Sequence, residues 1–132
     1  MSRMASLAAM VACCVLALLL LAANANAAAR QKVTLTWTPA APAFGDAVYF
    51  TATNVPDYTY VHVSCYQGDA FVMETYRGLA GASLYDLGQP VLMSNTYNDF
   101  WVSGGARCDL DVGGFPRGRW RSLLTDTLEV AP

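Results

Sequence analysis

Several residue types are scarce in this chain, and each scarcity removes a class of function. His62 is its only histidine, so a metal centre built from several histidines is excluded. Lys32 is its only lysine, and 8 basic side chains stand against 10 acidic ones. Nucleic-acid-binding domains carry a basic stripe, so we expect no nucleic-acid partner. Two of the 4 cysteines, Cys13 and Cys14, lie inside an apolar N-terminal run and do not resemble a lipoprotein acylation site.

Helical periodicity and catalytic motifs are also missing after the N-terminal run. No stretch of about ten residues there repeats its apolar positions with the period of a helix. No recognisable catalytic motif or closed set of metal ligands occurs. We therefore expect no enzymatic activity, no metal and no cofactor.

The N-terminal run has the pattern of a secretory leader. Arg3 precedes an almost wholly apolar segment, Met4 to Ala23, and alternating Ala and Asn follow it. This predicts a helical signal peptide over residues 1–27 and a secreted, extracellular domain over residues 28–132, with association to the cell envelope left open. An uncleaved anchor is the alternative, because the apolar segment is long enough to span a bilayer.

The predicted mature domain contains seven short segments that alternate apolar and polar side chains. They are Val33–Thr38, Ala47–Thr53, Tyr58–Tyr66, Phe71–Tyr76, Pro90–Thr96, Ala106–Val112 and Leu123–Val130. Alternation with period two predicts strands with one buried face. Seven short strands separated by turns rich in Gly, Pro and Asp are typical of a β-sandwich.

The connections between these segments are less regular. We expect residues 77–89 to form a strap across one end of the sandwich, and residues 97–105 to form a corner. In that corner Phe100, Trp101 and Val102 are predicted to cap the core. In the last strand Asp126 shares a face with apolar residues, which predicts a bulge or an irregular start.

Two motifs resemble strands of a known family. Gly45-Asp46-Ala-Val-Tyr-Phe and Gly104-Gly105-Ala-Arg-Cys108-Asp-Leu resemble the second and sixth strands of secreted bacterial immunoglobulin-like domains. The strand order and spacing resemble immunoglobulin-like and fibronectin-type-III-like domains over the whole mature chain. The resemblance implies an immunoglobulin-like β-sandwich of about seven antiparallel strands. One departure is that the second strand has no cysteine, whereas the third has Cys65.

Two cysteines outside the leader of a secreted chain predict one disulfide, Cys65–Cys108. In folds of the resembled family the third and sixth strands are neighbours, so the bridge would lie within one sheet. If the two cysteines face each other across an antiparallel pair, the outward-facing pairs are also defined. They are Tyr66 with Arg107, Ser64 with Asp109, and His62 with Asp111.

Two sets of residues on these strands were considered as chemical sites. Ser64, His62 and Asp111 have the residue types of a nucleophile, a base and an orienting group, which keeps a small hydrolase as a minor alternative. An open sheet face favours a simpler interpretation, an outward His62 paired with a carboxylate. Asp109 and Asp111 with Asp126 or Glu129 could offer oxygens to Ca²⁺, but a solvated sheet face is favoured.

The predicted loop Gly113–Ser122 is the most distinctive surface segment. Its candidate binding residues are Phe115, Arg117, Arg119, Trp120 and Arg121. Arg and Trp are enriched in binding hot spots, and the arginines predict an acidic protein or an anionic surface polymer as partner. In the other interpretation Trp120 folds back on the core and the arginines only keep the loop soluble.

A second candidate surface is the polar face of the third strand, with Tyr60, His62 and Tyr66, together with Arg107 on the sixth strand. Exposed tyrosines there, together with Tyr49, could stack on sugars. The sequence thus favours a secreted, non-enzymatic immunoglobulin-like binding or structural module. The alternative is a glycan- or envelope-binding module that uses the tyrosine face.

Overall fold

The computed structural model describes residues 32–80, 88–94 and 100–132. The elements in this part of the chain are β1 (Thr34–Thr38), β2 (Ala47–Thr53), β3 (Thr59–Gln67), β4 (Ala70–Ala80), β5 (Val91–Leu92), β6 (Ala106–Gly114), the 3-10 turn η1 (Pro116–Gly118) and β7 (Arg121–Val130). The predicted signal peptide over residues 1–27 lies outside the described residues.

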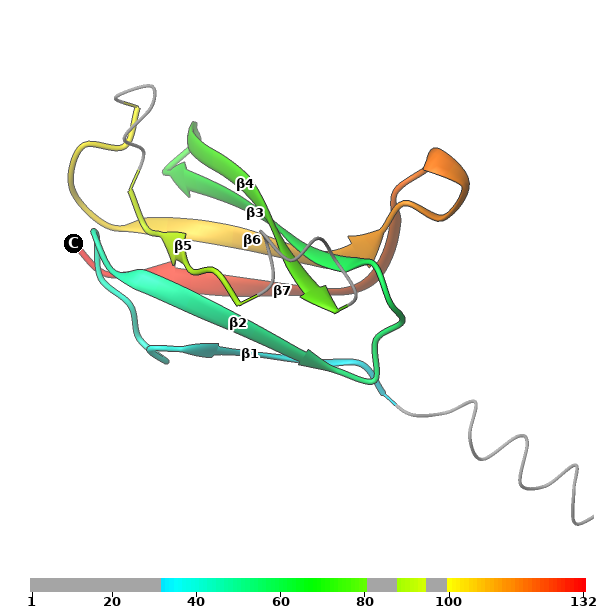
Figure 1. The fold of residues 1–132 in the computed structure, drawn as a ribbon. Coiled ribbons are helices and arrows are strands. Elements are labelled where there is room, and N and C mark those ends of the chain that lie inside the picture. The colour runs from blue at the N-terminus through cyan, green and yellow to red at the C-terminus, as the bar shows by residue number, and fades with distance from the viewer. Residues whose placement is uncertain (1–31, 81–87, 95–99) are drawn as a thin grey trace, which may run out of the picture. The chain divides into compact units, whose positions relative to one another are not determined.

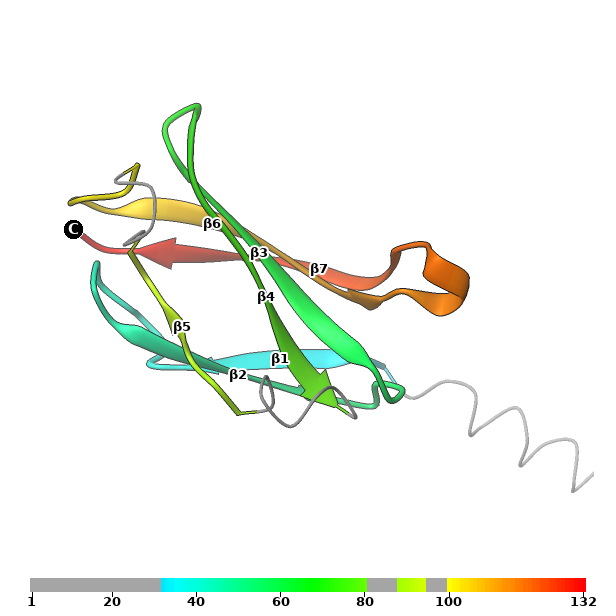
Figure 2. The same ribbon diagram turned by 45° about the horizontal axis from the view of Figure 1, so that its top comes forward.

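The strands form two antiparallel sheets (Figure 1, Figure 2). One sheet has the order β1-β2-β5, and the other has the order β4-β3-β6-β7. The chain changes sheet after β2, returns with β5, and changes again before β6 pairs with β3. This arrangement confirms the predicted all-β fold with two antiparallel sheets.

Apolar side chains from both sheets form one buried cluster. Its fully buried members include Val48, Val61, Val63, Met93, Trp101, Leu110 and Val112. The period-two pattern of β3 is reproduced, because its inward side chains are buried and its outward ones are only half-buried. Each fully buried Val or Leu contributes about 1.5–3 kcal/mol, so the inner faces of β3 and β6 supply a large part of the stabilisation.

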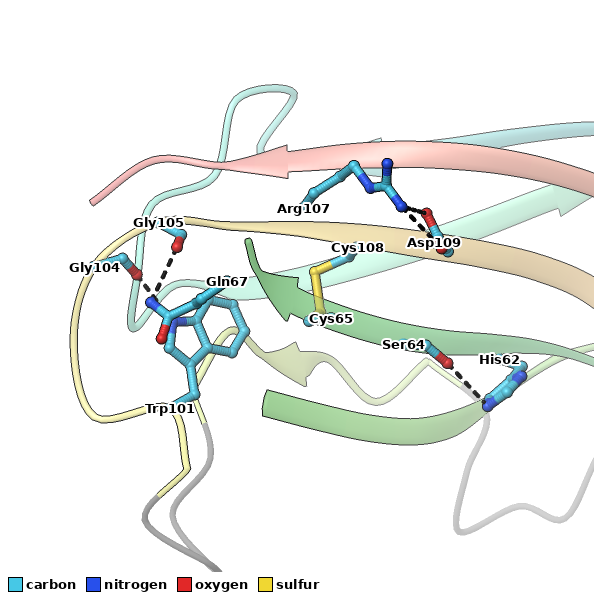
Figure 3. Close-up of a disulfide and its surroundings, with 10 residues drawn as sticks. All are labelled: His62, Ser64, Cys65, Gln67, Trp101, Gly104, Gly105, Arg107, Cys108 and Asp109. Atoms are coloured by element: carbon cyan, nitrogen blue, oxygen red, sulfur yellow. Dashed lines mark hydrogen bonds and ion pairs between the residues drawn. A yellow bond between two sulfur atoms is a disulfide. The ribbon is translucent and has the colours of Figure 1, made fainter. Parts of the chain in front are cut away.

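Cys65 and Cys108 form the predicted disulfide. Both residues belong to the four-stranded sheet, so the bridge links neighbouring strands β3 and β6 (Figure 3). The predicted register is confirmed at every outward pair: Tyr66 faces Arg107, Ser64 faces Asp109, and His62 faces Asp111.

β4 is longer than the sequence predicted. We expected an irregular strap from Arg77 onward, but β4 continues to Ala80. Gly78 does not end the strand: it lies opposite Tyr60, and a register shift between Thr59 and Tyr60 leaves the next β4 residue, Leu79, without an opposite residue. The remainder of the expected strap, residues 81–87, lies outside the described residues.

β5 is shorter than the predicted strand 90–96. Only Val91 and Leu92 pair with β2 as a ladder, because the next residue, Met93, bonds to the turn that precedes β2. Met93 donates to the Asp46 carbonyl at 2.8 Å and accepts from the Gly45 amide at 2.9 Å. The last two residues of the predicted strand lie outside the described part.

Of the three corner residues that were expected to cap the core, Trp101 does so. It is fully buried, packs 5.7 Å from the Phe44 ring centre, and donates its indole N–H to the Gly104 carbonyl at 2.9 Å. The prediction was wrong for Phe100 and Val102, which are 64% and 65% exposed. They flank Trp101, and successive side chains of an extended chain point in opposite directions.

β7 has the irregular start that the sequence predicted. The pairing with β6 shifts between Val112 and Gly113, which leaves Leu123 without an opposite residue. Further along, Asp126 lies opposite Leu110, whose side chain is fully buried. Asp126 therefore belongs to the core-facing side of β7, where its position at the edge of the sheet leaves it exposed.

Candidate functional site

The predicted exposed face lies on the outer surface of the four-stranded sheet. Tyr60, His62 and Tyr66 alternate along β3 with its buried residues and are half-buried. Arg107 is exposed opposite Tyr66 and forms an ion pair with Asp109, with Nη2 and Oδ1 3.3 Å apart (Figure 3). Tyr49 does not join this face, because it lies on β2 of the other sheet.

His62 is paired with a carboxylate, but not with the one expected. Its Nε2 lies 2.6 Å from Oε1 of Glu74 on β4. Asp111 stands opposite His62 in the register, yet its Oδ2 accepts the indole N–H of Trp120 at 2.8 Å. The predicted cross-strand position of His62 opposite Asp111 is thus correct, and so is its contact with a carboxylate, but the carboxylate belongs to Glu74 because Asp111 accepts from Trp120.

The arrangement around His62 lacks the geometry of a serine nucleophile. Ser64 Oγ lies 3.3 Å from Nε2 of His62 (Figure 3), the same nitrogen that contacts Glu74. In a catalytic triad the serine and the carboxylate contact opposite nitrogens of the histidine ring. One nitrogen accepts the serine proton, and the carboxylate at the other nitrogen orients the ring. Here both partners compete for one nitrogen.

The predicted loop Gly113–Ser122 is shorter in the structure, because both of its ends belong to strands. Gly113 and Gly114 belong to β6, and Arg121 begins β7, so the connection itself contains only residues 115–120 around η1. The close packing of Gly113 explains the residue type: a Cβ there would lie 2.8 Å from Cζ2 of Trp120. The glycines allow close approach of neighbouring groups and do not open the hairpin.

Trp120 folds back, but onto the outer face of the sheet and not onto the core. It joins His62, Tyr76 and Phe115 in an aromatic cluster. His62 and Tyr76 stack with ring centres 4.3 Å apart, and Phe115 meets Trp120 edge-on at 5.0 Å. Such pairs contribute about 0.5–1.5 kcal/mol beyond their buried area. The cluster therefore fastens the β6–β7 hairpin to the sheet.

The three arginines of the hairpin remain exposed above this packed base. Arg117 lies in the 3-10 turn with φ of 57°, an uncommon backbone conformation for a residue with a side chain, and Gly118 follows with φ of 76°. Arg119 precedes β7, and Arg121 is the first residue of β7; both side chains are exposed. The positive charges thus gather at one end of the four-stranded sheet.

A pocket of about 520 Å³ opens beside the hairpin. Half of its lining residues are aromatic or proline, and they come from the start of β3 on one side and the hairpin on the other: Pro56, Asp57, Tyr58, Thr59, Tyr60, Gly114, Phe115, Pro116, Arg121 and Leu123. Tyr58 and Phe115 at this pocket are 70% and 52% exposed. The pocket has the size and mixed lining of small-ligand sites.

No protein-family model, curated protein or solved structure matches the chain. Within the described residues, no group of three or more His, Cys, Asp or Glu side chains is placed to hold a metal ion. The same part of the chain contains no helix long and apolar enough to cross a membrane.

Sequence reasoning missed four residues at this end of the sheet. Glu74 and Tyr76 come from β4, and Asp57 and Tyr58 from the turn before β3. The segments Tyr58–Tyr66 and Phe71–Tyr76 were predicted as strands, but no cross-strand pairs were assigned between them. Tyr58 was treated only as the start of a strand, and Asp57 was not singled out.

Proposed function

We propose that the chain is a secreted, immunoglobulin-like or fibronectin-type-III-like module that binds a partner and performs no reaction. The three-plus-four arrangement of antiparallel strands supports this family assignment, as does the exchange of strands between sheets along the chain. A disulfide is usual in oxidising compartments, which supports secretion. The bridge within one sheet differs from the inter-sheet bridge of antibody domains.

The observation that best supports this proposal is the set of exposed arginines on a packed hairpin. Arg117 and Arg119 project from the connection of residues 115–120 and Arg121 from the start of β7, and the base of this hairpin is held by the Trp120–Asp111 hydrogen bond. A binding segment that is already ordered loses less conformational entropy on association than a flexible one. This favours the hairpin as the binding element over a merely solvated connection.

The partner is acidic. The chain has a formal charge of −2, and its positive side chains in the described part concentrate on this hairpin. Each guanidinium can donate paired hydrogen bonds to a carboxylate or a phosphate. Attraction of this kind is screened beyond about 8 Å at physiological ionic strength, so binding should weaken as salt rises.

The test compares binding of two proteins to cell-envelope fragments of the producing organism at low and physiological salt. One is the wild type, and the other carries Arg117→Ser, Arg119→Ser and Arg121→Ser. We expect the triple variant to lose binding by about tenfold or more at low salt, where exposed charges are least screened.

Arg107→Ser provides the control, because Arg107 is also exposed on the four-stranded sheet but lies outside the hairpin. It should bind as the wild type does. Equal binding by the wild type and the triple variant, with equal thermal stability, would show that the hairpin is not the binding element.

A further inference from the structure

The pocket beside the hairpin offers two kinds of surface to a ligand. Tyr58, Tyr60 and Phe115 present aromatic rings, and Pro56 and Pro116 add apolar walls. Large aromatic side chains as exposed as Tyr58 and Phe115, gathered at one concavity, are a common mark of a binding site.

Two charged groups of opposite sign, Asp57 and Arg121, also line this pocket. Neither side chain makes an ion pair or a hydrogen bond with another residue in the described ranges. Asp57 can only accept hydrogen bonds, whereas Arg121 can only donate them. A matching ligand therefore has hydrogen-bond donors and acceptors next to an apolar surface.

We infer that this pocket binds a pyranose ring of an acidic, uronic-acid polysaccharide. A sugar ring has an apolar C–H face that can pack on Tyr58 and Phe115, and hydroxyl groups that donate to Asp57 and accept from Arg121. Carboxylates of neighbouring sugar units would pair with Arg117 and Arg119. The inference rests on the proposed function, since it names the acidic partner of the same hairpin.

An acidic peptide fits this pocket less well than a sugar. Its carboxylates would be attracted by the arginines, but Asp57 would repel an acidic side chain that entered the pocket. A hydroxyl group has no such conflict with Asp57. The quantity to measure is therefore the affinity for a polyuronate compared with the affinity for an acidic polypeptide of similar charge.

The experiment measures binding of polygalacturonate and of poly-L-aspartate, matched in the number of carboxylates per chain, by calorimetry at low salt. The pocket variant is Tyr58→Asn. Tyr58 has φ of 61°, and asparagine tolerates this left-handed conformation better than most residues, so the turn is retained. Tyr49→Asn is the matched control, an exposed tyrosine on the other sheet.

We expect Tyr58→Asn to weaken polygalacturonate binding by about tenfold, the size of effect seen when one stacked ring is removed. Poly-L-aspartate binding should not change, and Tyr49→Asn should bind both polymers as the wild type does. Asp57→Asn should also weaken polygalacturonate binding and leave poly-L-aspartate binding unchanged or stronger.

The outcomes separate this inference from the proposed function. If the arginine triple variant loses both polymers while Tyr58→Asn loses neither, the hairpin binds acidic partners but the pocket is not a sugar site. The same conclusion follows if Tyr58→Asn weakens both polymers equally. If the triple variant binds both polymers as the wild type does, the proposed role of the hairpin itself is wrong.

Discussion

Cys65 and Cys108 face each other in the centre of the four-stranded sheet, with their Cα atoms 3.9 Å apart. This pair fixes every other pair between β3 and β6, because a slip by one residue would turn the core side chains outward. It thereby determines that His62 and Asp111 share the outer face on which the hairpin packs.

Loss of the disulfide should destabilise the domain strongly. The bridge spans 43 residues, and closure of such a loop in the unfolded chain corresponds to about 4 kcal/mol. We expect Cys65→Ala/Cys108→Ala to lower the free energy of unfolding by this order, measured by urea denaturation. Intact mass of the purified protein should be lower by two hydrogens than that of the reduced protein. Free Cys65 or Cys108 thiol in the purified protein would contradict the prediction.

The pairing of β3 with β6 was predictable from sequence, whereas the pairing of β3 with β4 was not. Cys65, Cys108 and the alternating apolar patterns of the two strands suffice to define the register of β3 against β6. A tight turn at Gly68 and Asp69 alone would place Thr75 opposite His62. A register shift between Cys65 and Tyr66 places Tyr76 opposite His62 instead. No sequence pattern in β4 predicts this shift.

The candidate site was predictable in its residues on the hairpin and in Tyr60 and His62 on β3, but not in how these residues come together. Phe115, Trp120 and the arginines are conspicuous by type and spacing, but the direction of Trp120 depends on Asp111 as a hydrogen-bond acceptor. The pocket depends on the approach of Tyr58 to the hairpin across the sheet end. Contacts of this kind between distant segments follow from the tertiary structure and not from local pattern.

The hydrogen bond between Trp120 and Asp111 should be measurable as a coupling energy. A hydrogen bond to a charged group contributes about 1.5–3 kcal/mol, and the partial exposure of this one lowers the expectation to about 1 kcal/mol. The measurement is a double-mutant cycle with Asp111→Ala and Trp120→Phe, which retains an aromatic ring. Additive effects of the two changes would show that the hydrogen bond does not stabilise the hairpin.

His62 should have a structural role only. With Ser64 and Glu74 on the same ring nitrogen, we expect no hydrolysis of ester or peptide substrates that depends on His62. The Glu74→Gln change should cost about 1 kcal/mol of stability or less, because the amide oxygen of glutamine can still contact Nε2 of His62 and a single side-chain hydrogen bond contributes about 0.5–1.5 kcal/mol. A substrate panel run on the wild type and His62→Ala provides the check. Turnover that disappears in the variant would contradict the non-enzymatic assignment.

Asp126 should keep the β7 edge from pairing with other molecules. β7 is an edge strand whose core-facing side includes Leu124, Leu128 and Val130, and a charge on that side disfavours addition of another strand.

We expect Asp126→Val to leave monomer stability unchanged or to raise it by up to about 1 kcal/mol, because valine favours strands. The same variant should associate as its concentration rises, since the edge then becomes continuously apolar. Light scattering over a concentration series, with thermal unfolding alongside, measures both effects. Thr127→Val is the control, since Thr127 lies opposite Asp109 and faces outward. Association of Thr127→Val to the same extent, or a monodisperse Asp126→Val, would show that the inward charge does not protect this edge.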